Sequence, residues 1–131
     1  MSGNSVLSKM ISSVKNARVG KNLSFVAVNS GVVRGCLDVL IQLGYISGYK
    51  VSEDTRTVYA VVNSVFGDKA ISNIVAISKP SKRFYATVDN LREMRMKNQF
   101  ITYVVSTSCG IMSSSDALKK NIGGEVLFFV C

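Results

Sequence analysis

The stretch FITYVVSTSCG, residues 100–110, decides the fold of this chain. Its first six residues are all aromatic or β-branched, which predicts a strand over residues 100–105. Three hydroxyl side chains then precede Gly110, so the strand is expected to end in a hydroxyl-rich turn.

The residues that follow this turn predict a short helix and a last strand. Ser113 or Ser114 can cap a helix through residues 116–120, which has an acid in its first turn and two lysines in its last. Asn121 can take the left-handed position after this helix. Residues 125–130, apolar after Glu125, are expected to form the last strand. The C-terminal half is therefore expected to be mostly strands with one short helix.

The residues before this stretch predict the order helix–strand–helix–strand–strand. Residues 23–28 alternate as a strand does, and strands near 45–51 and 57–63 are joined by a charged turn at 52–55. A further strand is expected over residues 71–77. The first helix presents one apolar stripe, which consists of Leu7, Met10 or Ile11, Val14 and Ala17.

The second helix of this half has recognisable ends. Ser30 is expected to cap its start, and Gly44 is expected to end it in the left-handed conformation. The expected fold class is α+β in two small lobes. We place the division at a composition break, which gives an N-terminal α/β lobe over residues 1–66 and a mostly-β lobe over residues 67–131.

Composition excludes several classes of function. Among its 131 residues the chain has no histidine, which removes Ser–His and Cys–His nucleophile pairs and the commonest metal ligand. The three cysteines, Cys36, Cys109 and Cys131, lack zinc-ligand spacing and are expected to be free thiols. Residues 98–115 carry no charge, but half of them are polar, so they cannot span a bilayer. We expect no enzyme, cofactor, metal or small-molecule substrate; a Cys109-dependent enzyme is the remote alternative.

The positive charge is concentrated in two blocks. The net charge is +8, with +5 in residues 1–37, −1 in residues 38–78, +5 in residues 79–120 and −1 from Glu125. Two basic blocks around a neutral one indicate a surface that binds a polyanion, and nucleic acid is favoured over a membrane surface or an acidic partner.

Three clusters could form the binding site. Residues 78–85, SKPSKRFY, combine three cations, a proline and a tyrosine that could bind phosphates and one base. The alternative is a solvated loop with Tyr85 in the core. Residues 106–110 offer short donors and acceptors, or a capping turn. Residues 123–125, GGE, allow close backbone approach to a partner or to a neighbouring strand, with Glu125 as an acceptor or as a structural partner of a base.

These clusters resemble the small ribosomal subunit protein eight family, whose members bind the central domain of the small-subunit RNA. SKPSKRFY is similar to the family's Ser-Arg-Pro-Gly-x-Arg-x-Tyr, VVSTSCGIM (residues 104–112) to Val-Val-Ser-Thr-Ser-Lys-Gly-Val-Met, and IGGEV (residues 122–126) to Leu-Gly-Gly-Glu-Ile. Their order and spacing also agree. The N-terminal half agrees more loosely, at Lys15-Asn16, at Ser30 and at Gly44-Tyr45-Ile46.

The resemblance implies a structural, RNA-binding component of the small ribosomal subunit that supports its assembly and contacts neighbouring ribosomal proteins. Cations of residues 79–83 would hold phosphates, residues 106–108 would read a distorted RNA helix, and Glu125 would organise those three hydroxyls. The RNA-binding residues that it implies are Lys15, Asn16, Ser30, Lys79, Lys82, Arg83, Tyr85, Ser106, Thr107, Ser108, Gly110, Gly123, Gly124 and Glu125.

The chain also departs from the family pattern. Cys109 replaces a lysine, Ser81 replaces a glycine, and Gly31 and Val33 stand where the bacterial pattern has lysines. Because of these losses, we expect the contacts with RNA to lie mainly in the C-terminal half.

Composition also suggests where the protein works. Residues 1–21 have the composition of a mitochondrial transit peptide or of an ordinary basic helix, and the resemblance favours the helix, so no removable leader is expected. Phe, Tyr, Met, Ile, Asn and Lys supply 44 of the 131 residues, whereas Gly, Ala, Arg and Pro supply 24. An AT-rich coding sequence produces this skew. We therefore expect a mitochondrial ribosome, with a plastid or a bacterial cytoplasm as the alternatives.

Overall fold

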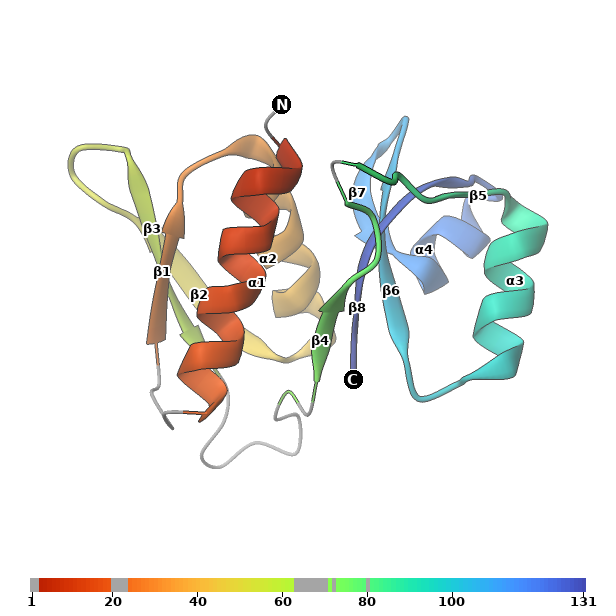
Figure 1. Ribbon diagram of the computed structural model, residues 1–131, viewed down its shortest axis with the longest axis horizontal. Coiled ribbons are helices and arrows are strands. Elements are labelled where there is room, and N and C mark those ends of the chain that lie inside the picture. The colour runs from red at the N-terminus through yellow and green to blue at the C-terminus, as the bar shows by residue number, and fades with distance from the viewer. Residues whose placement is uncertain (1–2, 20–23, 63–70, 72, 80) are drawn as a thin grey trace. The chain divides into compact units, whose positions relative to one another are not determined.

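The computed structural model describes residues 3–19, 24–62, 71, 73–79 and 81–131. The chain divides into two compact units, residues 1–72 and 73–131 (Figure 1). The division expected between residues 66 and 67 lies outside the described residues.

The first unit packs two helices against a three-stranded antiparallel sheet. Its elements are α1 (Gly3–Val19), β1 (Ser24–Val28), α2 (Gly31–Leu43), β2 (Ile46–Val51) and β3 (Thr57–Val62). The strand order is β1-β3-β2, and α1 contacts β1 while α2 contacts β2. The predicted order of elements is confirmed.

The predicted helical stripe and caps explain why these residues fold in this way. All five apolar residues of the predicted stripe on α1 are buried. The Ser30 side chain caps α2 by accepting the Val33 N–H at 3.2 Å. Gly44 follows α2 with a φ of 89°, the left-handed conformation predicted for it.

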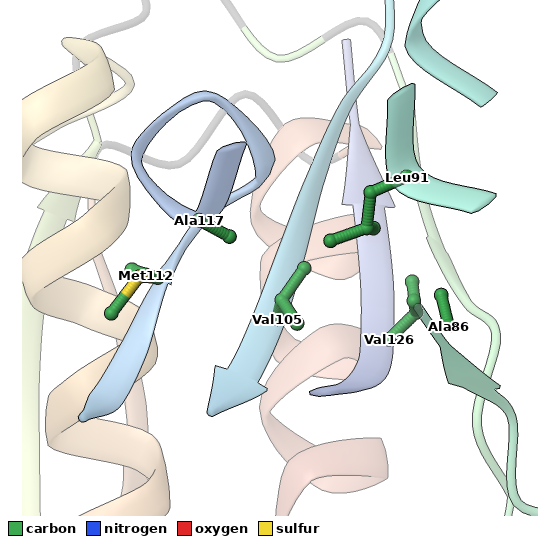
Figure 2. Close-up of a cluster of buried hydrophobic side chains, with 6 residues drawn as sticks. All are labelled: Ala86, Leu91, Val105, Met112, Ala117 and Val126. Carbon is green, nitrogen blue, oxygen red and sulfur yellow. The ribbon is translucent and has the colours of Figure 1, made fainter. Parts of the chain in front are cut away.

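The second unit is built on a sheet with β8 (Gly124–Val130) at its centre. Strand β8 pairs with β4 (Ile74–Ala76), β5 (Tyr85–Ala86) and β6 (Thr102–Thr107), and β6 also pairs with β7 (Gly110–Ser113). Two helices, α3 (Val88–Lys97) and α4 (Ser114–Lys119), complete the unit. Side chains from these helices and strands form one apolar cluster (Figure 2), which consists of Ala86, Leu91, Val105, Met112, Ala117 and Val126.

The α+β class is confirmed, but the expectation of one short helix in this half is wrong. Ser113 does cap the predicted helix, α4, and Asn121 follows it with a φ of 58°. The unpredicted helix is α3. Thr87 caps it by accepting the Asn90 N–H at 3.2 Å, and Leu91 buries its inner face. Within the described ranges, no helix has the length and apolarity that a membrane span requires.

Candidate nucleic-acid interface

Three side chains stand in a row across three adjacent strands of the second unit. In the register of the sheet, Glu125 of β8 lies opposite Tyr85 of β5 on one side and Ser106 of β6 on the other. Directly opposite residues project from the same face of a sheet. The next pair, Val105 and Val126, belongs to the buried cluster. The row therefore lies on the face that points away from this cluster, because successive side chains alternate between faces.

The Glu125 carboxylate at the centre of the row is held from two sides. The buried Ser78 hydroxyl donates a hydrogen bond to Oε2, and an Arg83 guanidinium nitrogen lies 3.5 Å from the same oxygen. The Ser78 oxygen also accepts the Phe84 N–H at 3.2 Å. Expected to organise the hydroxyls of residues 106–108, the carboxylate instead holds that of Ser78. Pairing with a base, the structural alternative for Glu125, is observed.

Arg83 can contact the Glu125 carboxylate and an anion from solvent at the same time. The Glu125 side chain is 13% exposed, whereas 43% of the Arg83 side chain remains in solvent. A guanidinium carries five donors in a planar fork, so one edge can face Glu125 while another faces a phosphate. The pair fixes the direction of this cation.

Tyr85 is not in the core. It is 67% exposed, and Phe84 beside it is 42% exposed. The backbone around them is tied to β8, since the Phe84 carbonyl accepts the Val126 N–H at 2.9 Å. Exposed aromatic rings on a rigid strand can stack on unpaired bases.

The hydroxyl-rich turn between β6 and β7 uses one of its three hydroxyls internally. The Thr107 hydroxyl donates to the Gly110 carbonyl at 2.7 Å and accepts the Cys109 N–H at 3.1 Å. Gly110 has a φ of +113°, a conformation that residues with a side chain rarely adopt. Ser108 is exposed and Ser106 is half-buried. Thr107 thus shapes the turn that presents the two serines.

Gly123 and Gly124 let the chain at the start of β8 lie very close to the neighbouring strands β5 and β6. A Cβ on Gly124 would overlap the Ser106 carbonyl, and a Cβ on Gly123 would overlap the Ala86 carbonyl. Of the two expected reasons for these glycines, the structure shows approach to neighbouring strands. This contact brings the hydroxyl turn next to Glu125.

The lysines of the basic cluster stand on a turn closed by the main chain. The N–H of Lys79 donates to the carbonyl of Lys82 at 2.9 Å, and the reverse bond measures 3.0 Å. Both lysines are exposed. Pro80 lies outside the described residues. The turn leads directly into Arg83 and the row.

The remaining expected site residues belong to the first unit. Lys15 and Asn16 are exposed on α1. Ser30 is the cap of α2, so its side-chain oxygen already accepts a backbone N–H. The second unit alone brings Arg83, Tyr85, Ser106 and Glu125 together.

Sequence reasoning left two residues of this surface out of the expected site. Ser78 opens the SKPSKRFY motif, and its place in that motif was the available signal. Phe84 was assigned no role because the pairing of β5 with β8 is not visible in the sequence. The register of β5 with β8 places Phe84 beside the row, and the hydrogen bond to Glu125 places Ser78 there.

Comparison of the sequence with known proteins identifies one family. The family model described as ribosomal protein S8 matches residues 5–131. The small ribosomal subunit protein uS8 of Campylobacter hominis is 37% identical over 127 residues, which cover 95% of each chain. That of Kosmotoga olearia is 35% identical over 95% of this chain and 96% of its own. That of Rickettsia rickettsii is 36% identical over 90% of each.

Proposed function

The chain belongs to the ribosomal protein S8 family, a family of structural, non-enzymatic proteins of the small ribosomal subunit, and we propose that it binds the central domain of the small-subunit RNA and supports its assembly. We assign the RNA contact to the C-terminal lobe, residues 67–131. Exposed cations next to exposed aromatics and hydroxyls on one face are the residue types that RNA recognition uses.

The single observation that carries this proposal is the row formed by Tyr85, Glu125 and Ser106. An A-form major groove is too narrow for side chains, so RNA is recognised by shape and by unpaired bases. A rigid row of an aromatic ring, a fixed carboxylate and a hydroxyl fits an unpaired base and its sugar. Arg83 and the lysines of residues 79–82 would bind the flanking phosphates. Ser106, Thr107, Ser108 and Gly110 form the wall of this site, with Gly123 and Gly124 beneath it.

In this proposal the first unit contributes a second, smaller contact. Lys15 and Asn16 are exposed on α1 and would approach the sugar–phosphate backbone. Ser30 would reach RNA through a lone pair that the Val33 N–H leaves open.

Footprinting of the purified protein on small-subunit RNA tests the proposal. We expect protection confined to one irregular helix of the central domain. Absence of protection anywhere in the RNA would contradict it.

A double substitution separates reading from charge attraction. Ser106→Ala with Ser108→Ala removes two hydroxyls and no charge, so cognate affinity should fall about tenfold or more while weak binding to an arbitrary duplex is kept. Filter binding on both RNAs measures this. Equal loss on both would contradict the assigned role.

We infer further that the protein works in a mitochondrial ribosome. The support is the excess of residues encoded by AT-rich codons. The relatives compared above are bacterial and do not distinguish a mitochondrial ribosome from a bacterial one. Probing small subunits from separated mitochondria and cytosol tests this. Recovery from cytosolic subunits alone, or a gene on a bacterial chromosome, would contradict it.

A further inference from the structure

Helix α3 and its continuation line a hollow in the second unit. Arg92, Arg95 and Met96 follow the i, i+3, i+4 spacing of one helical face, and Gln99 lies two residues beyond the end of the helix. With Leu118 of α4 they line a space of about 450 Å³. Helices α3 and α4 contact each other within the unit (Figure 1). A hollow of this volume accommodates at least one large side chain.

Two large apolar side chains in or next to this lining are exposed. Met96 of the lining is 73% exposed, and Phe100, which follows the lining residue Gln99 in the sequence, is 89% exposed. Methionine, aromatic residues and arginine are the types enriched where proteins bind one another. This patch, comprising Arg92, Arg95, Met96, Gln99, Phe100 and Leu118, is called the α3 patch below.

The charges on α3 favour a protein over RNA as the occupant. Asp89 and Glu93 on the same helix have side chains 92% and 66% exposed, and they pair with Arg92 at 3.0 Å and Lys97 at 3.4 Å. Phosphates approaching this helix would meet two solvent-exposed carboxylates. The acid of the proposed RNA surface, Glu125, is largely covered and faces Arg83. RNA-binding surfaces draw their affinity from unopposed cations, which α3 lacks in number.

Arg95 defines the charge that the occupant must carry. Among the described residues it forms no ion pair, whereas Arg92 is held by Asp89. An unpaired guanidinium in a hollow that Met96 and Leu118 also line complements a carboxylate that follows or precedes an apolar side chain.

We propose that the α3 patch binds a segment of a neighbouring small-subunit protein, with an apolar side chain in the hollow and a carboxylate on Arg95. This inference rests on the proposed function for the position of the chain within the subunit. It adds a protein-binding surface to the RNA-binding one and names the chemistry of the segment that it takes.

Photo-crosslinking in assembled small subunits tests the occupant. A photoreactive amino acid replaces Phe100, whose exposure makes the fold insensitive to the change. We expect crosslinks to a peptide of another small-subunit protein that has an apolar residue next to an aspartate, a glutamate or a terminal carboxylate. Crosslinks to RNA, to an acid-free peptide, or to nothing would overturn the proposal.

Two variants and a matched control test the chemistry. Arg95→Glu and Met96→Ser should each lower the crosslink yield roughly tenfold, the loss typical of a residue central to an interface. Lys97→Glu makes the same charge change on the same helix, outside the lining of the hollow, and should leave the yield unchanged. Equal yields in all three variants would also overturn the proposal.

RNA footprinting of the same proteins separates the two proposals. A crosslink to protein without a footprint would contradict the proposed RNA contact and leave the α3 patch standing. A footprint with crosslinks to RNA at position 100 would do the reverse.

Discussion

Glu125 sets the arrangement of the proposed RNA surface, because one carboxylate holds Ser78 and Arg83 at once. Glu125→Gln keeps the size and the acceptor for Ser78 but removes the charge that directs Arg83. We expect the affinity for cognate RNA to fall by about 1.5–3 kcal/mol, the contribution of a hydrogen bond to a charged group. Binding to an arbitrary duplex should not fall, since an acid has been removed. Filter binding on both RNAs measures the ratio.

Glu93→Gln is the matched control for this substitution. Glu93 lies on α3 and is exposed, so it makes the same change in net charge away from the row. If Glu93→Gln lowered cognate affinity as much as Glu125→Gln, the role of Glu125 would reduce to net charge.

Cys36 gives the stability of the first unit a dependence on alkaline pH. Burial within α2 raises the pKa of its thiol from 9.0 to about 12. The unfolded chain loses this proton near pH 9, whereas the folded chain keeps it until about pH 12. The thiol therefore leaves the free energy of unfolding unchanged below pH 9 and lowers it as the pH rises from 9 to 12. Between pH 8 and pH 10.5 the free energy of unfolding should fall by about 2 kcal/mol more in the wild type than in Cys36→Ala. Urea unfolding at both pH values measures this. Cys109→Ala, at an exposed cysteine, should track the wild type.

Among the elements, those with a strong apolar period were predictable and the others were not. Helix α1 buries five side chains of one stripe, and α2 has both a serine cap and a glycine stop. In α3 Leu91 is buried and Met94 half-buried, while charges interrupt the pattern and Met96 faces solvent. Strand β5 has two residues, too few for any period. The position of α3 depends on its packing on α4, and the position of β5 depends on its pairing with β8. Both are contacts between distant parts of the chain.

The same limit applies to the site. Its residue types were identifiable from three motifs, but the row of Tyr85, Glu125 and Ser106 depends on strand register. The internal role of Thr107 depends on the geometry of a turn. Neither could be obtained without the paired strands.

Substitution of Ser30, the cap of α2, tests whether this residue contributes to the stability of the fold. Ser30→Ala removes the acceptor for the Val33 N–H and should lower the free energy of unfolding by about 1 kcal/mol. Ser30→Asp should restore most of it, because aspartate caps helices as well as serine does. Urea midpoints of the three proteins measure this. An unchanged midpoint in Ser30→Ala would mean that the cap contributes nothing measurable.

At the scale of the whole molecule, the number of cations in contact with phosphates, rather than the net charge of +8, is expected to set how the proposed RNA binding responds to salt. Each lysine in contact with a phosphate adds about 0.7–0.9 to the slope of log affinity against log salt concentration. Lys82→Ala should reduce the slope by about that amount. Lys50→Ala removes an equal charge from an exposed position on β2 and should not change it. A salt titration of both variants decides whether the slope follows position or total charge.

The central place of β8 also orders events during synthesis. Strand β8 comes after β4, β5 and β6 in the chain, yet all three pair with it. A nascent chain can complete the sheet of the first unit once residue 62 has emerged, whereas the sheet of the second unit must wait for residues 124–130. Tyr85 and Ser106 are not bridged by Glu125 before then. Unfinished chains therefore lack the row. If the row binds RNA as proposed, they do not compete with finished chains for it, and the order of synthesis acts as a check on completeness.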